Sequence, residues 1–310
     1  MKGSSAIQLS HIVDTYNHKQ VIDEIKKLFL SYYSEKEFKK IRKVYTQVKK
    51  LFEGRFTGYR ECNTQYHDFR HTLDALLATT RLLDGYNLSH NPIPEETARN
   101  VLVAALLHDT GYIQESWDTE GTGAKYTKNH VHRSVEFTSK NHVALGINQK
   151  DIPEISQYIQ STGLSTRFEE IPFLSKAQKT CGAFLGTADL LGQMADREYL
   201  EKLLFLYYEF REAGVPGYET EFDIIRKTEG FYVLTRDRLK DSYMNVQRYT
   251  KKHFSHRYDI DANLYMLAIN RHIKYLRKII KDETTNFRHK LKRGNQEMLH
   301  TLSQQPRVQH

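Results

Sequence analysis

The chain has 310 residues, 27% of them charged, and a formal net charge of +8. This length supports a substantial core in one large domain or two ordinary ones, and six prolines with sixteen glycines favour long helices over a many-turned sheet. Two cysteines without metal-ligand spacing exclude a disulfide framework, and no apolar run approaches the length of a membrane span. We therefore expect an all-α cytoplasmic protein without a signal peptide, whose positive charge attracts anions without selecting one.

The first 65 residues are predicted to form helices that pack on a central core. Apolar residues recur at helical intervals from Leu9 to Tyr33, and Ser34 begins a second helix over 35–50. Gly54 and Gly58 then break the pattern ahead of the first histidine cluster.

That cluster is Tyr66-His67-Asp68-Phe69-Arg70-His71. If Thr64 caps a helix here, His67 and His71 lie one turn apart on one face and can share a metal site. A pair at this spacing also arises by chance in a chain with fifteen histidines, so further ligands are needed.

The second cluster ends an apolar run, where His108 and Asp109 follow Val101–Leu107. Pro94 and the acidic residues after it predict a helix start, and Gly111 predicts its end. Near a helix end both side chains can converge on one ion beyond the last turn. A buried histidine hydrogen-bonded to its neighbour is the alternative.

Residues 112–129 are polar and irregular, which predicts a mobile lid or binding loop directly after these candidate ligands. A helix then begins near His130, and His132 and Glu136 share one face of it. These two residues are either part of the site or a solvated helix start.

A helix over 175–194 carries Asp189 among apolar residues. A buried carboxylate needs a partner or a cation, and the histidines offer a shared metal. Gln193 lies one turn further, where it is either a substrate contact or an ordinary polar residue.

The remaining helical patterns run over 197–212, 231–254 and 260–280. A stripe in the last of them is suited to core packing or dimerisation and leaves the oligomeric state open; it comprises Ile269, Ile273, Leu276 and Ile280. Basic residues dominate from Arg271 to Arg293, and 304–310 are predicted to be a flexible tail.

The ordered pattern His71, His108-Asp109, Asp189 resembles the HD-domain metal-dependent phosphohydrolases. The resemblance covers about residues 66–212. Tyr66-His67 with His71 is also similar to the opening motif of class I cyclic-nucleotide phosphodiesterases, and residues 133–136 are similar to a later segment of those enzymes. This chain differs from them at Asp68, where they carry Asn, and at residues 110–112, where they carry a further histidine.

The resemblance implies an all-α core over 66–212 with N-terminal helices over 1–65 and a basic helical extension over 213–310. It implies a metal held by His71, His108, Asp109 and Asp189, with His67 as general acid. We expect one or two divalent ions, with Mn, Fe, Co, Ni and Zn all compatible with imidazole and carboxylate ligands and Mg compatible with a second site.

For the second ion we predict His132 as a ligand, with His130 as its competitor and Asp109 as the bridge. Phosphate charge would be neutralised by Arg70, Lys128 and Arg133, and Gln193 would contact the substrate. The predicted function is hydrolysis of a phosphodiester or phosphomonoester of a nucleotide-type substrate. The alternative is a degenerate HD protein that binds nucleic acid or a partner through its basic C-terminal helices.

Overall fold

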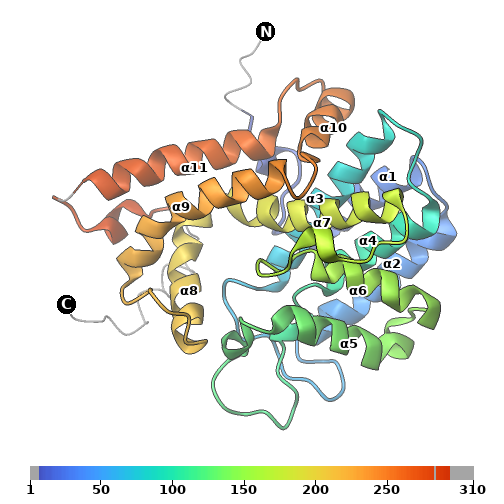
Figure 1. Cartoon of the computed structure of the whole chain (residues 1–310), viewed down its shortest axis with the longest axis horizontal. Helices are drawn as coiled ribbons and strands as arrows, with labels where there is room; N and C mark the ends of the chain where they lie inside the picture. The colour runs from blue at the N-terminus through green and yellow to red at the C-terminus, as the bar shows by residue number, and fades with distance from the viewer. Residues whose placement is uncertain (1–6, 283, 294–310) are drawn as a thin grey trace.

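The computed structural model describes residues 7–282 and 284–293, and within them the protein is all-helical, which confirms the predicted fold class (Figure 1). The α-helices of this part are α1 (His18–Leu30), α2 (Glu35–Phe52), α3 (Phe69–Asn87), α4 (Glu95–Leu107), α5 (His130–Leu145), α6 (Ile152–Gln160), α7 (Lys176–Ala195), α8 (Tyr199–Glu212), α9 (Glu221–Lys240), α10 (Arg248–Tyr258) and α11 (Leu264–Lys281).

Helices α3 and α7 form the centre of the molecule and are the two helices most extensively packed against each other. Helices α1, α4 and α10 pack around α3, while α8, α9 and α11 form an arm on the other side (Figure 1). Buried apolar side chains from Val13 to Leu291 form one continuous cluster. The N-terminal and C-terminal helices therefore complete the same core as the central ones.

Side-chain caps explain several helix starts. The Ser34 hydroxyl accepts a hydrogen bond from the Glu37 N–H, and Ser175 caps α7 in the same way. The continuous helix predicted from Leu9 was wrong. A 3-10 turn (η1, Leu9–His11) comes first, and α1 begins only after Asn17, whose side chain accepts from the Gln20 N–H.

The predicted helix over 231–254 is also interrupted. Helix α9 ends at Lys240, and Met244 and Asn245 adopt left-handed backbone conformations with φ of 54° and 56°. A right-handed helix cannot pass through such residues, so α10 starts again at Arg248. Because the hydrophobic period continues across this turn, the sequence pattern does not indicate that the helix ends there.

The C-terminal part of the arm is paired internally. Three basic side chains there form ion pairs with acidic ones: Arg277 with Glu229, Arg288 with Glu221, and Lys290 with Asp282. The predicted stripe of α11 packs inward, because Ile269, Ile273 and Leu276 are buried in the shared core. No described helix is both long and apolar enough to cross a membrane. The predicted tail at 304–310 lies outside the described residues.

Candidate metal centre

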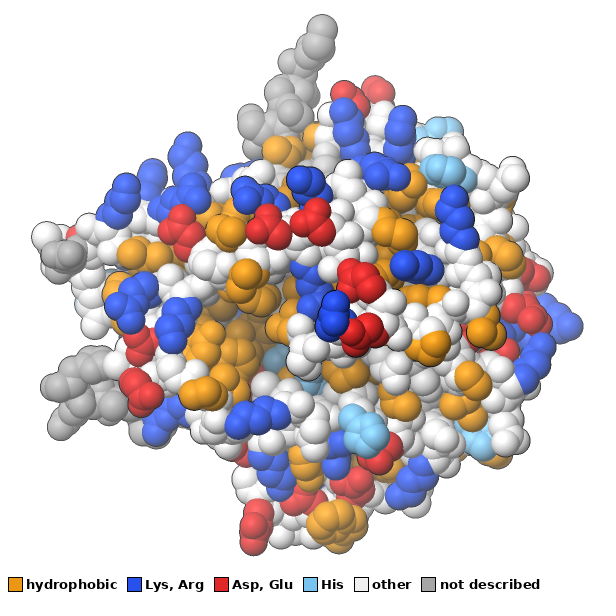
Figure 2. Space-filling model, in the orientation of Figure 1, with side chains coloured by type: hydrophobic (Ala, Val, Ile, Leu, Met, Phe, Trp, Pro, Cys, Tyr) orange, Lys and Arg blue, Asp and Glu red, His pale blue; other side chains and the backbone are white. Residues whose placement is uncertain are grey.

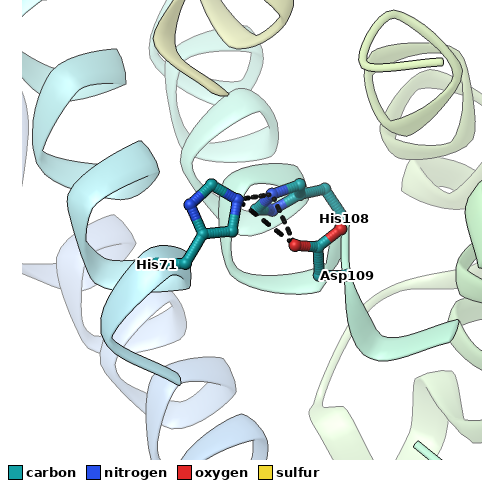
Figure 3. Close-up of side chains that lie close together, drawn as sticks. All are labelled: His71, His108 and Asp109. Carbon is teal, nitrogen blue, oxygen red and sulfur yellow. Dashed lines mark hydrogen bonds and ion pairs between the residues drawn. The ribbon is translucent and has the colours of Figure 1, made fainter. Parts of the chain in front are cut away.

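His71, His108 and Asp109 converge at the buried ends of two helices (Figure 3). The two Nε2 atoms of the histidines lie 3.3 Å apart, and Asp109 Oδ2 lies 3.3 Å from each. All three side chains are almost completely buried. Three ligand atoms within 4.8 Å of one another form a group that could hold a metal ion.

A hydrogen bond to the backbone orients His108 for metal binding. Helix α4 ends at Leu107, and His108 Nδ1 lies 2.9 Å from the Ala105 carbonyl, to which it must donate. This hydrogen bond selects the tautomer whose Nε2 lone pair faces His71 and Asp109. Because neutral imidazole nitrogen is the ligating form, His108 is oriented as a metal ligand.

Helix α7 brings the predicted fourth carboxylate to the same place. Asp189 Oδ1 lies 3.1 Å from His71 Nε2 and 3.6 Å from His108 Nε2. The Gln193 amide donates to Asp189 Oδ1 at 2.7 Å and lies 3.4 Å from His71 Nε2. The structure thus brings together the four predicted ligands and one predicted substrate contact.

The pKa shifts in this cluster show that its imidazoles and carboxylates stabilise one another's charged forms. Burial lowers the pKa of His71, but Asp109 and Asp189 outweigh it and raise the pKa to about 10. Burial also lowers the pKa of His108, and the same carboxylates give a net rise. Although burial disfavours their charge, the histidines hold the pKa values of Asp109 and Asp189 below the ordinary value. The cluster therefore favours a cation between its members.

One orphaned atom tests whether a metal fits. Asp109 Oδ2 is buried without a hydrogen-bond partner among the described residues, although it faces two imidazole nitrogens. A buried carboxylate oxygen without a donor is costly, and a divalent cation among these atoms would remove that cost. The donor set, two nitrogens with two carboxylates and no thiolate, fits a divalent transition metal without selecting one.

His67 lies beside the cluster, but not on the predicted helix. Asp68 is the N-cap of α3, so His67 precedes the first turn, and Thr64 donates to its carbonyl instead of capping a helix. The rings of His67 and His71 are nevertheless 6.0 Å apart. His67 Nδ1 lies 2.6 Å from Glu209 Oε2, which accepts its proton and orients its Nε2.

Three rings stack over one side of the centre. Tyr112 lies between His67 and His130, with ring centroids 4.2 Å and 4.5 Å away. Burial raises the pKa of Tyr112 well above its ordinary value, so the phenol stays neutral. The Tyr112 hydroxyl lies 3.4 Å from His67 Nε2. The stack holds the rings of His67 and His130 in place beside the candidate metal ligands.

His130, not His132, faces the candidate ligands. His130 Nδ1 lies 2.8 Å from the Thr127 carbonyl, and its Nε2 lies 3.8 Å from Asp109 Oδ1. His132 has a side chain 73% exposed and pairs with Glu136 at 3.1 Å. Two helical residues turn the direction of a side chain by about 200°, so α5 can present only one of the two histidines to the centre. The prediction for His132 is corrected accordingly.

Gly111 does not end α4 as predicted, but it allows α5 to approach the His108–Asp109 turn. A Cβ at Gly111 would lie 2.0 Å from the His130 carbonyl oxygen. The Gly111 N–H donates to Ser134 Oγ, which in turn donates to the His108 carbonyl. Because Ser134 is fully buried, these two hydrogen bonds attach the start of α5 to the metal-binding turn.

The predicted loop over 112–129 has defined internal contacts. It contains a 3-10 turn (η3, Gly123–Tyr126), and Glu115 forms a β-bridge with Tyr59. Lys125 pairs with Asp118 at 2.5 Å. Apart from this turn and this bridge the segment is irregular, as predicted, and its charged side chains are partly paired with one another. Its predicted role as a mobile lid stays a prediction.

The three cations predicted to bind phosphate all have protein partners. Arg70 pairs with Asp196 and Glu198, and Lys128 donates to the Gly214 carbonyl. Arg133 donates to the carbonyl of Gly111 and pairs with Glu115. Their contact with phosphate stays a prediction.

Glu209 was missed by sequence reasoning. It is 5% exposed and lies on the same buried side of α8 as Lys202 and Phe205. An acidic residue at spacing 202, 205, 209 on an amphipathic helix is the signal that could have found it.

A hollow lies on the face of the protein seen in Figure 2. Figure 2 shows a depression between the α8–α9 arm and the body around α5–α7, with apolar side chains on the arm and a histidine in its depth. Asp189 and His130 keep 12% and 22% of their side chains exposed. His71, His108 and Asp109 are thus almost completely buried, and the solvent-exposed edge of the centre is formed by Asp189 and His130.

Residues 115–266 match the model of the Npun_R2479-like family, so slightly less than half of the chain is similar to that family. The matched segment includes His130, Asp189 and Glu209 and leaves out His71, His108 and Asp109. No curated protein matches the chain.

Proposed function

We propose that this protein is a metal-dependent phosphohydrolase of the HD-domain type, which cleaves a phosphodiester or phosphomonoester of a nucleotide-type substrate. The observation that carries the proposal is the convergence of His71, His108, Asp109 and Asp189 on one buried point. His71, His108, Asp109 and Asp189 would hold the ion. A divalent ion bound there would supply a water whose pKa falls from 15.7 to about 7, and hence a nucleophile at neutral pH.

His67 is the proposed general acid. Its Nδ1 is occupied by Glu209, so the proton it gives to the leaving oxygen would come from Nε2. Glu209 acts as a positioning residue, because a carboxylate on Nδ1 fixes the orientation of the ring and the direction of its Nε2. Proton donation of this kind is worth about 10²–10⁴ in rate.

We further propose His130 as the donor for a second ion, with Asp109 as the bridge. The two oxygens of Asp109 are directed apart: Oδ2 faces His71 and His108, and Oδ1 faces His130. The His130–Thr127 hydrogen bond leaves the His130 Nε2 lone pair on the Asp109 side. Burial lowers the pKa of His130, which keeps its ring in the neutral, ligating form.

The experiment is a hydrolysis screen with added Mn²⁺. The substrates are cyclic nucleotides, cyclic dinucleotides, nucleoside mono-, di- and triphosphates, and a chromogenic phosphodiester. We expect turnover of at least one of them by the wild type and none by Asp109→Asn. If wild type and Asp109→Asn are equally inactive on every substrate while both bind metal equally, the proposal is refuted.

A matched pair of histidine variants tests the second ion. His130→Ala should lose about one equivalent of metal and most of the activity found in the screen, whereas His132→Ala should retain both. The same readouts contradict the assignment if the two variants behave alike.

A further inference from the structure

A cavity with mixed apolar and charged walls lies beside the N-terminal segment, away from the metal-binding turn. Its volume is about 680 Å³, and its walls come from the segment around η1, from α3, from the end of α7 and from α11. The N-terminal segment lies against α11 and forms one side of the cavity. The residues that line it include Arg70, Arg81, Arg197, Arg271 and Arg293.

Several of these arginines have no acidic partner. Within the described ranges, Arg81, Arg197 and Arg271 form no ion pair with any carboxylate, in contrast to Arg70, which pairs with Asp196 and Glu198. The latter two acids also line the cavity, so their charge is already used by Arg70. Asp14 and Asp74 also line the cavity, so five arginines there face four carboxylates and the positive charge exceeds the negative by one.

Arg81 is the strongest indication of a ligand. It is 2% exposed, and its Nε and Nη2 atoms have no hydrogen-bond partner among the residues described. Its one hydrogen bond is from Nη1 to the Tyr265 hydroxyl, at 2.9 Å. A buried guanidinium with unused donors is costly, and an oxyanion is the ligand whose geometry satisfies its planar fork.

Two acids that Arg70 does not fully compensate oppose an anion in the cavity, the exposed Asp14 and the partly buried Asp74. Asp74 has no hydrogen bond among the described residues, and its nearest cation is Arg70, whose Nε lies 3.9 Å away. Asp74 is three residues along α3 from His71, so it also lies on the path between the two polar regions. Its negative charge should weaken anion binding without abolishing it. Removing this charge should therefore strengthen binding, which is the opposite of the effect expected from removing an arginine.

We propose that the cavity is a binding site for a small oxyanion, either a phosphate or a carboxylate compound, recognised by Arg81 in its floor and by Arg197 and Arg271 at its rim. The latter two side chains are exposed, so they can adjust to a ligand without disturbing the core. This site is separate from the proposed metal chemistry and does not depend on it.

The test measures equilibrium binding of inorganic phosphate and of citrate to the full-length chain after treatment with EDTA, which removes metal-dependent phosphate binding. We expect saturable binding of at least one probe, and the comparison of the two identifies the preferred oxyanion. Arg81→Gln should weaken binding at least about tenfold, as expected for loss of a charge-assisted hydrogen bond. Asp74→Asn should strengthen it.

Further variants keep the test decisive if Arg81→Gln does not fold. The exposed Arg197→Gln and Arg271→Gln should each weaken binding several-fold, and the double variant more. Arg236→Gln, an exposed arginine of α9 outside the cavity, is the control and should bind like the wild type. The proposal is overturned if neither probe binds saturably, if the cavity variants bind like Arg236→Gln, or if Asp109→Asn abolishes binding and the arginine variants do not.

Discussion

The metal centre and the arginine cavity lie at two regions of α3 and differ in how their charges are compensated. At the centre, imidazoles and carboxylates face one another within 3.6 Å, and one carboxylate oxygen lacks a donor. In the cavity, two donors of the buried Arg81 guanidinium lack an acceptor among the described residues. The first arrangement favours a bound cation and the second a bound anion.

The fold alone explains neither region, because each contains a buried polar atom without a partner among the described residues. Buried polar groups in proteins are almost always paired, so a buried polar atom without a partner calls for an explanation, and a bound ligand is one such explanation. Within the described part of the chain, Asp109 carries an unpaired acceptor and Arg81 carries unpaired donors. Both residues lie on or beside the central helices α3 and α7. Changes to each region should therefore have separable effects.

The largest effect is expected from removing the proposed acid. His67→Gln should lower kcat by about 10²–10⁴ on the substrate found in the screen, because the leaving oxygen would depart unprotonated. Metal content should stay at the wild-type level, since His67 is not among the candidate ligands. Steady-state kinetics and elemental analysis of the same preparation measure both. A loss of metal in this variant would assign His67 to the ligand set instead.

The next effect concerns the contact between α5 and the metal-binding turn. Gly111→Ala should lower the free energy of unfolding by about 3 kcal/mol, because its Cβ would overlap the His130 carbonyl oxygen. Denaturant unfolding measures this change. Gly230→Ala is the control, because nothing lies within 4 Å of a Cβ there and the substitution should stabilise α9 by up to about 1 kcal/mol. Equal stability of the two variants would contradict the close approach.

A smaller effect of opposite sign is expected from Asp74. Burial raises the pKa of Asp74 from 3.8 to about 6 despite Arg70 nearby, so the folded state resists ionisation of this carboxyl. The resulting penalty is absent below about pH 4, grows as the pH rises toward 6 and is complete above it. Asp74→Asn should therefore raise stability by about 1–2 kcal/mol at pH 8 and leave it unchanged at pH 3.5.

Thermal unfolding at the two pH values checks this prediction. The exposed Asp23→Asn serves as the control and should show no such pH dependence. An equal change in the stability of Asp74→Asn at both pH values would mean that folding does not raise the pKa of this carboxyl.

Sequence reasoning found the helical class and most helix limits because hydrophobic period and caps act locally. It also found His71, His108, Asp109 and Asp189, since an imidazole or carboxylate inside an apolar helix is anomalous wherever the helix packs. It chose His132 over His130 because His132 shares a helical face with Glu136, which was expected to orient its ring. The rotation of α5 places that pair at the surface instead and turns His130 toward Asp109. Glu209 could have been found from its spacing on the buried side of α8, whereas the role of Arg81 depends on tertiary burial that the sequence does not indicate.

The most direct test of the metal centre is the metal content of the purified protein. Wild type and His132→Gln should each contain at least about one equivalent of a divalent transition metal, while Asp109→Asn and His108→Gln should contain little, provided that all four show the same helical circular dichroism. Equal metal in wild type and in both ligand variants, or no metal in a folded wild type supplied with Mn²⁺, Fe²⁺, Co²⁺, Ni²⁺ and Zn²⁺, would contradict the assignment.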